Sequence, residues 1–269
     1  MRAIPILLYH SVSDNPSPAL ADYTLAPARF DEHLAVIADQ GWRTITVGEL
    51  TKRVAGGAIT EDRTLVITFD DGFADTAEEA APILERHGFA ATVYVTSGCV
   101  GQECDWLGPT GRRPMASWQQ LRDLSGSGWE IGAHSVDHSQ LDVLRPAALR
   151  EQVRGSRSEL QDHLGLPVES FAYPHGYHSG RVRREVIAAG FRSACAVKNS
   201  LSSTADDPYA LARLTVTSTM TGDDLARMLG GQDKRTRIMA GGRELTRTKV
   251  WRCYRRVRHE AVRATRGLR

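Results

Sequence analysis

The chain has 269 residues, 41% of them hydrophobic and 25% charged, which is typical of a globular protein and excludes a disordered or fibrous chain. This length allows one large α/β domain or two small ones, each with a buried core. The N-terminal apolar stretch from Ile4 to Tyr9 is too short to cross a bilayer, and it lacks the features of a signal peptide. We therefore expect a cytoplasmic protein, or one that is peripheral on the inner face of the membrane.

The net charge of +2 is unevenly distributed. The segment from Lys234 to Arg269 has 13 Lys and Arg and two acidic residues, a net charge of +11, whereas the rest of the chain carries −9. Val250, Tyr254 and Val257 recur in this segment at helical spacing. Such a tail can be an interfacial helix on anionic lipid or a solvated appendage. Binding of nucleic acid through phosphates is the least favoured of the three interpretations.

Strand-like and helix-like segments alternate before the tail. In chain order, the pattern predicts a strand at Ile4–Tyr9, a helix at Ala28–Gln40, strands at Trp42–Thr46 and Thr64–Phe69, a helix from Thr76 to His87, a strand at Ala91–Val95, a helix beginning at Ser117, a strand at Trp129–Ala133, a helix from Pro146 to about Leu164, a strand at Ser170–Tyr173 and a helix at Ser179–Ala189. Thr76 with Glu79, and Ser117 with Gln120, have the spacing of capping boxes. We divide the chain into a catalytic domain, residues 1–230, and a basic, partly helical tail, residues 231–269.

Strand–helix units in series predict a parallel sheet covered by helices, either a barrel or an open doubly wound sheet. No glycine-rich phosphate loop follows any predicted strand, which disfavours a nucleotide-binding fold.

Two adjacent carboxylates follow the strand Thr64–Phe69. Because neighbouring residues on a strand point to opposite faces, Asp70 and Asp71 can share a site only where the strand ends. Two carboxylates held together repel each other unless a cation lies between them. His134 and His138 are four residues apart, and two histidines with one carboxylate and an open position make a hydrolytic metal site.

The candidate chemical residues share one position in the predicted fold, since each follows a predicted strand. The carboxyl ends of parallel strands are where barrel and doubly wound enzymes place their sites. We therefore expect one active site that contains His10, Asp70, Asp71, His134, His138, Tyr173, Pro174 and His175.

Two motifs resemble a known family. Ile67–Gly72 (Ile-Thr-Phe-Asp-Asp-Gly) and His134–His138 (His-Ser-Val-Asp-His) resemble the first two motifs of the NodB-homology polysaccharide deacetylases, carbohydrate esterase family 4. The third motif of the exopolysaccharide deacetylases reads much like Phe171–Gly176, and the resemblance covers roughly Ile4 to Leu229. It implies a distorted (β/α)₇ barrel that hydrolyses the N-acetyl group of an amino sugar in a polysaccharide, oligosaccharide or glycolipid and releases acetate.

The resemblance also implies residue roles. Asp71, His134 and His138 would hold a divalent metal, usually Zn²⁺ and sometimes Co²⁺ or Ni²⁺. Asp70 would be the general base that takes a proton from the metal-bound water. A backbone N–H near Tyr173 would bind the oxyanion.

The chain departs from the family pattern in two places. Ala172 stands where the family commonly has an Arg that orients the base aspartate, and the Leu-x-His motif of the general acid is not evident in Leu211–Val216. Arg213, in that segment, is a candidate to replace the missing Arg beside Asp70. A salt bridge at the surface or at the edge of the core is an equally good interpretation of Arg213.

The leaving amine still needs a proton. The candidate donors are His10, His175 and His178, with His10 and His175 ranked level. Because no histidine occupies the expected position, a degenerate protein that binds a glycan without turnover is an alternative. An amidohydrolase that acts on a non-sugar amide is another. The expected partner is an N-acetylated glycan or a lipid-linked sugar.

The aromatic residues and cysteines allow weaker predictions. Trp106 is equally a substrate-contacting residue or a packing one, and Tyr177 is a candidate sugar-stacking face. Trp42, Trp118 and Trp129 are expected in the core. Histidines 87, 163 and 259 are expected to be solvated and without partners. The four cysteines have no metal-finger spacing, and reduced thiols are favoured over a disulfide between the first two.

Overall fold

A computed structural model of the chain describes residues 3–57, 63–108 and 111–230. The basic tail predicted at 231–269, with its expected helix and its candidate interactions, lies outside the described residues. No helix within the described ranges is long and apolar enough to cross a membrane.

The structure alternates strands with helices, as the sequence predicts. The strands are β1 (Ala3–Ile4), β2 (Ile6–Tyr9), β3 (Ser11–Val12), β4 (Thr24–Leu25), β5 (Arg43–Ile45), β6 (Thr64–Phe69), β7 (Thr92–Val95), β8 (Glu130–Ala133), β9 (Ser170–Ala172), β10 (Ser193–Cys195), β11 (Ser202–Ser203) and β12 (Leu214–Thr215). The helices are α1 (Pro27–Asp39), α2 (Val47–Ala55), α3 (Ala81–Arg86), α4 (Trp118–Gly126), α5 (Pro146–Arg150), α6 (Ser156–Leu164), α7 (Gly180–Ala188) and α8 (Gly222–Leu229).

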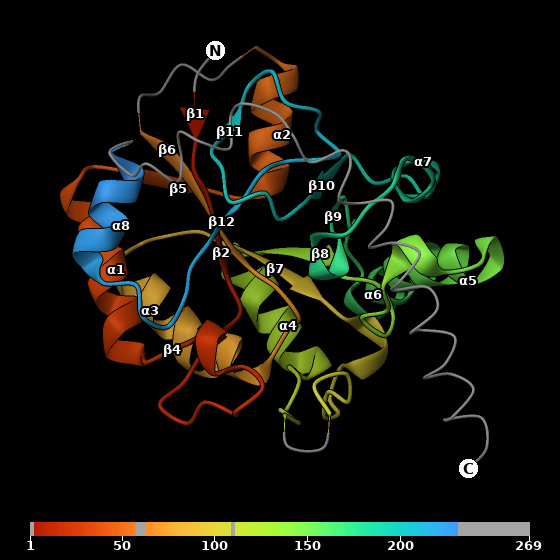
Figure 1. Ribbon diagram of the computed structural model, residues 1–269, viewed down its shortest axis with the longest axis horizontal. Helices are drawn as coiled ribbons and strands as arrows, with labels where there is room; N and C mark the ends of the chain where they lie inside the picture. The colour runs from red at the N-terminus through yellow and green to blue at the C-terminus, as the bar shows by residue number, and fades with distance from the viewer. Residues whose placement is uncertain (1–2, 58–62, 109–110, 231–269) are drawn as a thin grey trace.

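Within the described residues, eight strands form one parallel sheet, in the order β10-β9-β8-β7-β6-β2-β12, with β5 paired to the first half of β6. The two ends of this sheet meet, because Leu211 bridges Cys195 of β10 just before the same segment enters β12. Seven strands thus make a ring at the centre of the molecule, with the helices around it (Figure 1). The predicted distorted (β/α)₇ barrel is confirmed, and the insertion of β5 beside β6 is part of its distortion.

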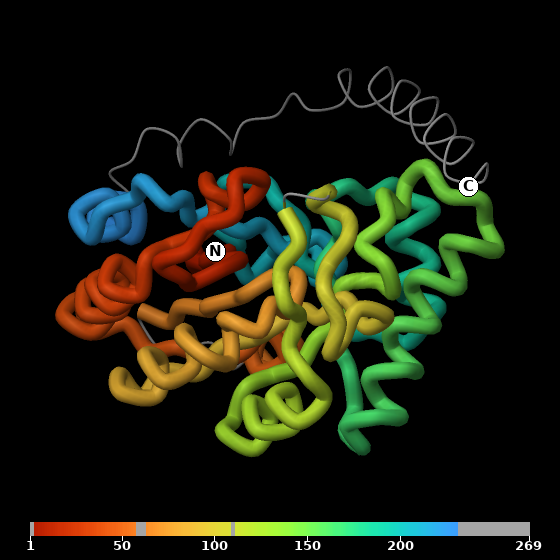
Figure 2. The backbone as a smooth tube through the Cα atoms, turned by 90° about the horizontal axis from the view of Figure 1, so that it is seen from below, coloured from red at the N-terminus to blue at the C-terminus, as the bar shows by residue number. Residues whose placement is uncertain are grey.

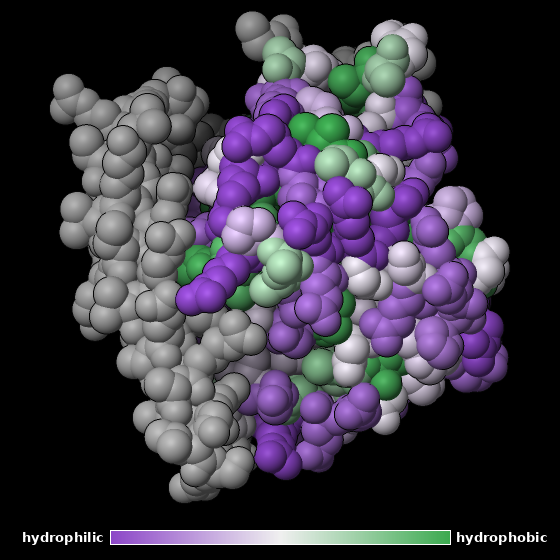
Figure 3. Space-filling model, turned by 90° about the vertical axis from the view of Figure 1, so that its right-hand side faces the viewer, coloured by the Kyte–Doolittle hydropathy of each residue, from purple (hydrophilic) through white to green (hydrophobic). Residues whose placement is uncertain are grey.

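Alternate residues of the strands pack in two separate apolar clusters. Ile6, Val66 and Tyr94 belong to the inner cluster, whereas their chain neighbours Leu7, Ile67 and Val93 belong to the large outer one. This is the period of two that a strand imposes, with one face inside the ring and the other against the helices. The outer surface of the helices faces solvent, and the face over α5, α6 and α7 is mostly hydrophilic (Figure 3).

The last helix packs against the first. Glu32 of α1 accepts a hydrogen bond from the N–H of Gly222, at the start of α8, at 2.8 Å. Both views show α8 beside α1 (Figures 1 and 2). Helix α8, which was not predicted from the sequence, therefore lies against α1 and adds Leu225, Met228 and Leu229 to the large outer cluster. Its capping box, Thr221 with Asp224, was the available signal.

Several local predictions are corrected. Thr76 does not cap a helix: it is buried at the start of a π-helical turn, Thr76–Ala80, which precedes α3. The capping box at Ser117 is confirmed. His87 is not free, because it bonds the carboxylate of Asp31 at 2.8 Å, and His163 stacks on Trp118.

The placement of the tryptophans and cysteines agrees closely with expectation. Trp129 is in the core, while Trp42 and Trp118 are partly buried against it. The described cysteines, Cys99, Cys104 and Cys195, are all free thiols.

The interior of the ring is packed so closely that an added methyl group should be destabilising. A Cβ on Gly132 of β8 would lie 2.5 Å from ring atoms of Tyr94 and 2.8 Å from Ser170 Oγ. We expect Gly132→Ala to lower the free energy of unfolding by about 1–3 kcal/mol, measured by urea denaturation.

Gly126→Ala is the matched control, because nothing lies within 4 Å of a Cβ at this helical position. Alanine there should be neutral or stabilising by up to about 1 kcal/mol. Equal losses in both variants would contradict the interpretation of a tightly filled barrel.

Candidate active site

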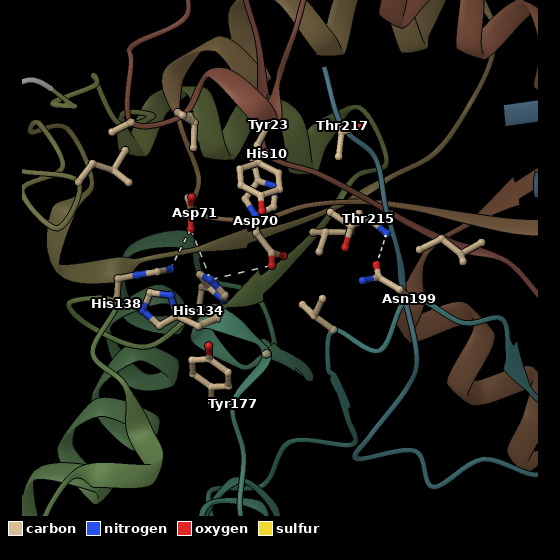
Figure 4. A pocket seen from close by; sticks show the side chains of 18 of the residues that line it. His10, Tyr23, Asp70, Asp71, His134, His138, Tyr177, Asn199, Thr215 and Thr217 are labelled. Atoms are coloured by element: carbon tan, nitrogen blue, oxygen red, sulfur yellow. Dashed lines mark hydrogen bonds and ion pairs between the residues drawn. The ribbon is translucent and has the colours of Figure 1, made fainter. Parts of the chain in front are cut away.

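A cavity of about 810 Å³ lies over the carboxyl ends of the central strands. His10 follows β2, Asp70 and Asp71 follow β6, and His134 follows β8, and all four line the cavity with His138 (Figure 4). The fold thus brings together these five residues, which were predicted to share one site.

Asp71 faces two histidines. Its Oδ1 atom is 3.2 Å from His138 Nε2 and 3.4 Å from His134 Nε2, and the three residues can present ligand atoms within 4.8 Å of one another. All three side chains are buried. Asp71 Oδ1 has no hydrogen-bond partner among the described residues. A buried carboxylate oxygen that faces two imidazole nitrogens suits a cation, and this set of donors is one that zinc accepts. The residues present therefore fit a divalent metal.

The backbone turns sharply to bring both carboxylates to one side. Asp71 has a φ of +75° and Gly72 one of +84°, so the chain enters left-handed conformations directly after β6. An added Cβ at Gly72 would also lie 3.2 Å from Val95 Cα, so glycine is needed there for space as well. Ser135 and His138 also have positive φ, at +66° and +60°. Non-glycine residues in this region cost roughly 1–3 kcal/mol each and cluster at functional sites.

His134 is held in a defined orientation and tautomer. Its Nδ1 lies 2.9 Å from the carbonyl oxygen of Ala172, so Nδ1 carries a proton and Nε2 is the nitrogen that faces Asp71. Metal-ligating histidines are usually oriented by such a bond. Burial opposes the charged form of His134, but the nearby carboxylates of Asp70 and Asp71 raise its pKa above the ordinary value. These carboxylates therefore favour a positive charge at this point of the cavity.

Asp70 is paired with a buried arginine. Arg213 Nη1 donates to Asp70 Oδ1 at 2.6 Å, and Nη2 donates to Oδ2 at 2.7 Å. The guanidinium is fully buried, and it also donates to the carbonyl of Ala196 and to Thr68 Oγ1. Burial alone would raise the pKa of the Asp70 carboxyl, but Arg213 and His134 bring it below its ordinary value. Asp70 is thus ionised and able to accept a proton.

The structure also decides between the two interpretations of Arg213. A surface or core-edge salt bridge is wrong, since the side chain has 0% exposure inside the ring. Arg213 reaches Asp70 from a segment that is distant in the sequence. Ala172, at the end of β9, stands at the position where the resemblance would place the orienting Arg.

Burial of the Asp71 carboxyl also opposes its charge, yet His138 and His134 hold its pKa well below the ordinary value. Two adjacent carboxylates are therefore both ionised, each facing its own positive or metal-ligating groups. One faces two imidazoles, and the other is held by a guanidinium.

Three aromatic residues that were predicted for the site line the cavity. His10 lines the cavity beside Asp70, its ring 5.1 Å from that of Tyr23 (Figure 4). His175 also lines the cavity but is exposed, with its ring edge-on to His138 at 4.5 Å. Tyr177 is 41% exposed at the cavity wall.

Tyr173 is directed away from the cavity. Its hydroxyl donates to the carbonyl of Tyr209 at 2.9 Å, and its N–H donates to the carbonyl of Cys195 at 3.1 Å. Neither group of Tyr173 is available to an oxyanion in this structure. His178 stacks on Tyr173 and is not part of the cavity wall.

The opposite wall of the cavity was not predicted from the sequence. Asn199, Thr215 and Thr217 line it, and Thr215 donates its N–H to Asn199 Oδ1 at 3.2 Å (Figure 4). Strand β12 has only two residues, so no periodic pattern could have predicted it. Tyr23 was missed because it lies in a short 3₁₀ turn, Ala21–Tyr23.

Fold and site together define a parallel-barrel protein with an Asp-His-His set that fits a metal and a second, arginine-paired carboxylate beside it. The family model "Polysaccharide deacetylase" matches residues 57–194, more than half of the chain. The chain belongs to the polysaccharide deacetylase family.

Individual relatives are distant. The chain is 23% identical over 219 residues to YxkH of Bacillus subtilis (strain 168), whose name places it among the polysaccharide deacetylases, and the match covers 81% of this chain and 73% of YxkH. It is 21% identical over 209 residues to the poly-beta-1,6-N-acetyl-D-glucosamine N-deacetylase of Staphylococcus aureus (strain MSSA476), covering 74% of this chain and 70% of that one.

Among solved structures, the Streptococcus pyogenes deacetylase PplD in complex with acetate is similar with a TM-score of 0.75 and 20% identity, covering 86% of this chain and 99% of PplD. At this level of identity, the likeness establishes a shared fold.

The ion pair in the barrel should be strongly coupled. We expect Arg213→Met to lower the free energy of unfolding by about 3–5 kcal/mol, because it leaves the Asp70 charge buried and unpaired. The double variant Asp70→Asn/Arg213→Met should lose less than the two single losses combined. Urea denaturation of the metal-free proteins measures all three.

Arg154→Met is the control, since the Arg154 side chain of the Arg154–Glu185 pair is 52% exposed and exposed pairs contribute about 0.2–1 kcal/mol. Additive losses in the Asp70/Arg213 cycle would show that the two side chains do not act as a pair.

Proposed function

We propose that the protein is a metal-dependent carbohydrate N-deacetylase. It hydrolyses the N-acetyl group of an amino sugar in a polysaccharide, oligosaccharide or glycolipid and releases acetate. The observation that carries this proposal is the division of labour between two adjacent buried carboxylates, with Asp71 facing His134 and His138 and Asp70 paired with Arg213. Family membership and the name of the Staphylococcus aureus relative support an N-acetylated glycan as the substrate class.

A divalent metal, for which we propose Zn²⁺ with Co²⁺ and Ni²⁺ as alternatives, would lower the pKa of a bound water to about 7 and polarise the acetamide carbonyl. Asp70 accepts the proton of the attacking water. Its Oδ2 atom lies 4.0 Å from His134 Nε2 and so faces the metal ligands. Arg213 holds both oxygens of this carboxylate, which fixes its orientation and keeps it ionised until the proton arrives.

The amine that leaves must receive a proton, and we assign this step to His10. Its ring lies beside Asp70 within the cavity, and its Nδ1 is buried without a hydrogen-bond partner among the described residues (Figure 4). His175 is exposed and packs edge-on against His138, at the outer side of the metal ligands. Proximity to the base favours His10, because the proton has a short path from the attacking water to the leaving nitrogen.

Two predictions, about membrane association and about location in the cell, rest on the sequence alone. The basic tail would bring the enzyme to an anionic membrane surface where a lipid-linked sugar is presented. The cytoplasmic location is likewise a prediction.

The function is tested by acetate release from N-acetylated oligosaccharides, measured together with metal content by elemental analysis. We expect about one transition metal per chain, and Asp70→Asn should keep it while losing about 10²–10⁴-fold in kcat, the usual contribution of a general base. His134→Ala/His138→Ala should lose both metal and activity.

Two outcomes would redirect the assignment. Glycan binding without acetate release by the metal-loaded wild type would favour the binding-only alternative. A wild type that contains no metal and does not bind added zinc, cobalt or nickel would contradict a metal-dependent hydrolysis.

The proton donor is tested by comparing His10→Gln with His175→Gln. We expect His10→Gln to lose about 10²–10⁴-fold in kcat/KM, and His175→Gln, its matched control in the same cavity, to lose much less. Metal content should be unchanged in both. A larger loss for His175→Gln would reverse the assignment.

A further inference from the structure

The two histidines that face Asp71 are oriented in different ways. His134 donates its Nδ1 proton to the carbonyl of Ala172, the arrangement usual for a metal ligand. The corresponding atom of His138, Nδ1, is buried and has no hydrogen-bond partner in the described part of the chain. Apart from Asp71, whose Oδ1 faces His138 Nε2 at 3.2 Å, the orientation of the His138 ring depends on what packs against it.

The main chain around His138 is well fixed. The N–H of His138 donates to Ser135 Oγ at 3.0 Å, and the N–H groups of Val136 and Asp137 both donate to Gln152 Oε1 at 3.1 Å. These bonds place the Cα atom of His138. They do not fix the rotation of its side chain, which depends on the contact with Asp71 and on the groups packed against the ring.

Aromatic rings supply that packing. The indole of Trp106 is stacked on the His138 ring, with centroids 4.8 Å apart and an angle of 17° between the planes. His175 contacts the same ring edge-on at 4.5 Å and 75°. Because His175 is exposed whereas Trp106 is partly buried, Trp106 is the more constrained of the two neighbours.

Trp106 is itself anchored to the barrel. It lies between the paired residues Glu103 and Pro114, and its ring also stacks near that of the fully buried Phe73, at 6.3 Å and 30°. The same segment is tied down by Arg113, whose guanidinium donates to Asp75 at 2.6 Å within a largely buried ion pair. The indole is thus supported from behind as well as stacked on His138.

We propose that Trp106 is a positioning residue for the metal ligand His138, in which ring stacking replaces the hydrogen bond that orients His134. This inference rests on the proposed metal centre and adds to it a residue that determines metal affinity. It also decides between the two interpretations that the sequence left open for Trp106, because the part of the indole that covers His138 is not available to a sugar ring.

The test measures zinc affinity without any glycan, by competition with a chromophoric chelator on the full-length chain. We expect Trp106→Leu, which keeps apolar bulk against Phe73 but has no aromatic face, to weaken zinc binding about 10- to 100-fold, the usual effect of losing a ligand's orienting partner. Trp106→Phe retains a stacking ring and should restore most of the affinity.

Trp118→Leu is the matched control. Trp118 stacks on His163 at 4.0 Å and 11°, and neither residue lines the cavity. The zinc affinity of Trp118→Leu should equal that of the wild type. Wild-type affinity in Trp106→Leu, or an equal loss in Trp118→Leu, would overturn the proposal.

A second measurement does not depend on the folding of Trp106→Leu. Zinc binding should change the tryptophan fluorescence of the wild type, because the imidazole stacked on Trp106 becomes a ligand, and Trp106→Phe should lose this change while Trp118→Phe keeps it. A full change in Trp106→Phe would overturn the proposal.

The two proposals fail in different ways. A wild type without metal affinity removes the metal centre itself. A wild type that binds zinc and releases acetate, with unaltered affinity in Trp106→Leu, removes only the role of Trp106.

Discussion

Repulsion between two adjacent carboxylates is the constraint on which the site depends. Asp70 and Asp71 are both buried at the end of β6, and neither could stay ionised there without compensation. The structure gives each its own partner. Arg213 forms a bidentate pair with Asp70, and Asp71 faces the imidazoles of His134 and His138. Because the partners differ, two chemically identical side chains have different electrostatic environments.

The barrel allows the two carboxylates to have separate partners because it holds a buried arginine beside Asp70. Arg213 lies inside the ring, where an unpaired guanidinium would be very costly. Each of its three nitrogens donates a hydrogen bond, and the acceptors are Asp70, Thr68 and the carbonyl of Ala196. The segment that carries Arg213 also closes the barrel, since Leu211 bridges β10 and β12 pairs with β2. The segment that closes the barrel therefore also orients the Asp70 carboxylate.

Rigidity around the metal ligands comes from several kinds of contact. Positive φ angles at Asp71 and His138 place the side chains, and hydrogen bonds from Gln152 and Ser135 hold the loop that follows β8. The two rings have different neighbours, since His134 donates to the Ala172 carbonyl and His138 is stacked on Trp106. A site that binds a small cation needs this precision, because ligand distances must be met within a few tenths of an ångström.

The sequence by itself determined the parallel α/β class, most strand positions, and the metal-ligand candidates, because these are encoded in short contiguous patterns: an apolar strand, the carboxylates at its end, and a histidine pair four residues apart. The resemblance to the deacetylases added the seven-stranded barrel. Only the tertiary structure decided that Arg213 meets Asp70, that Tyr173 turns away from the cavity, and that Trp106 covers His138. Each of these contacts joins segments far apart in the chain or depends on loop geometry, so no local pattern encodes it, and ring closure and packing alone select it.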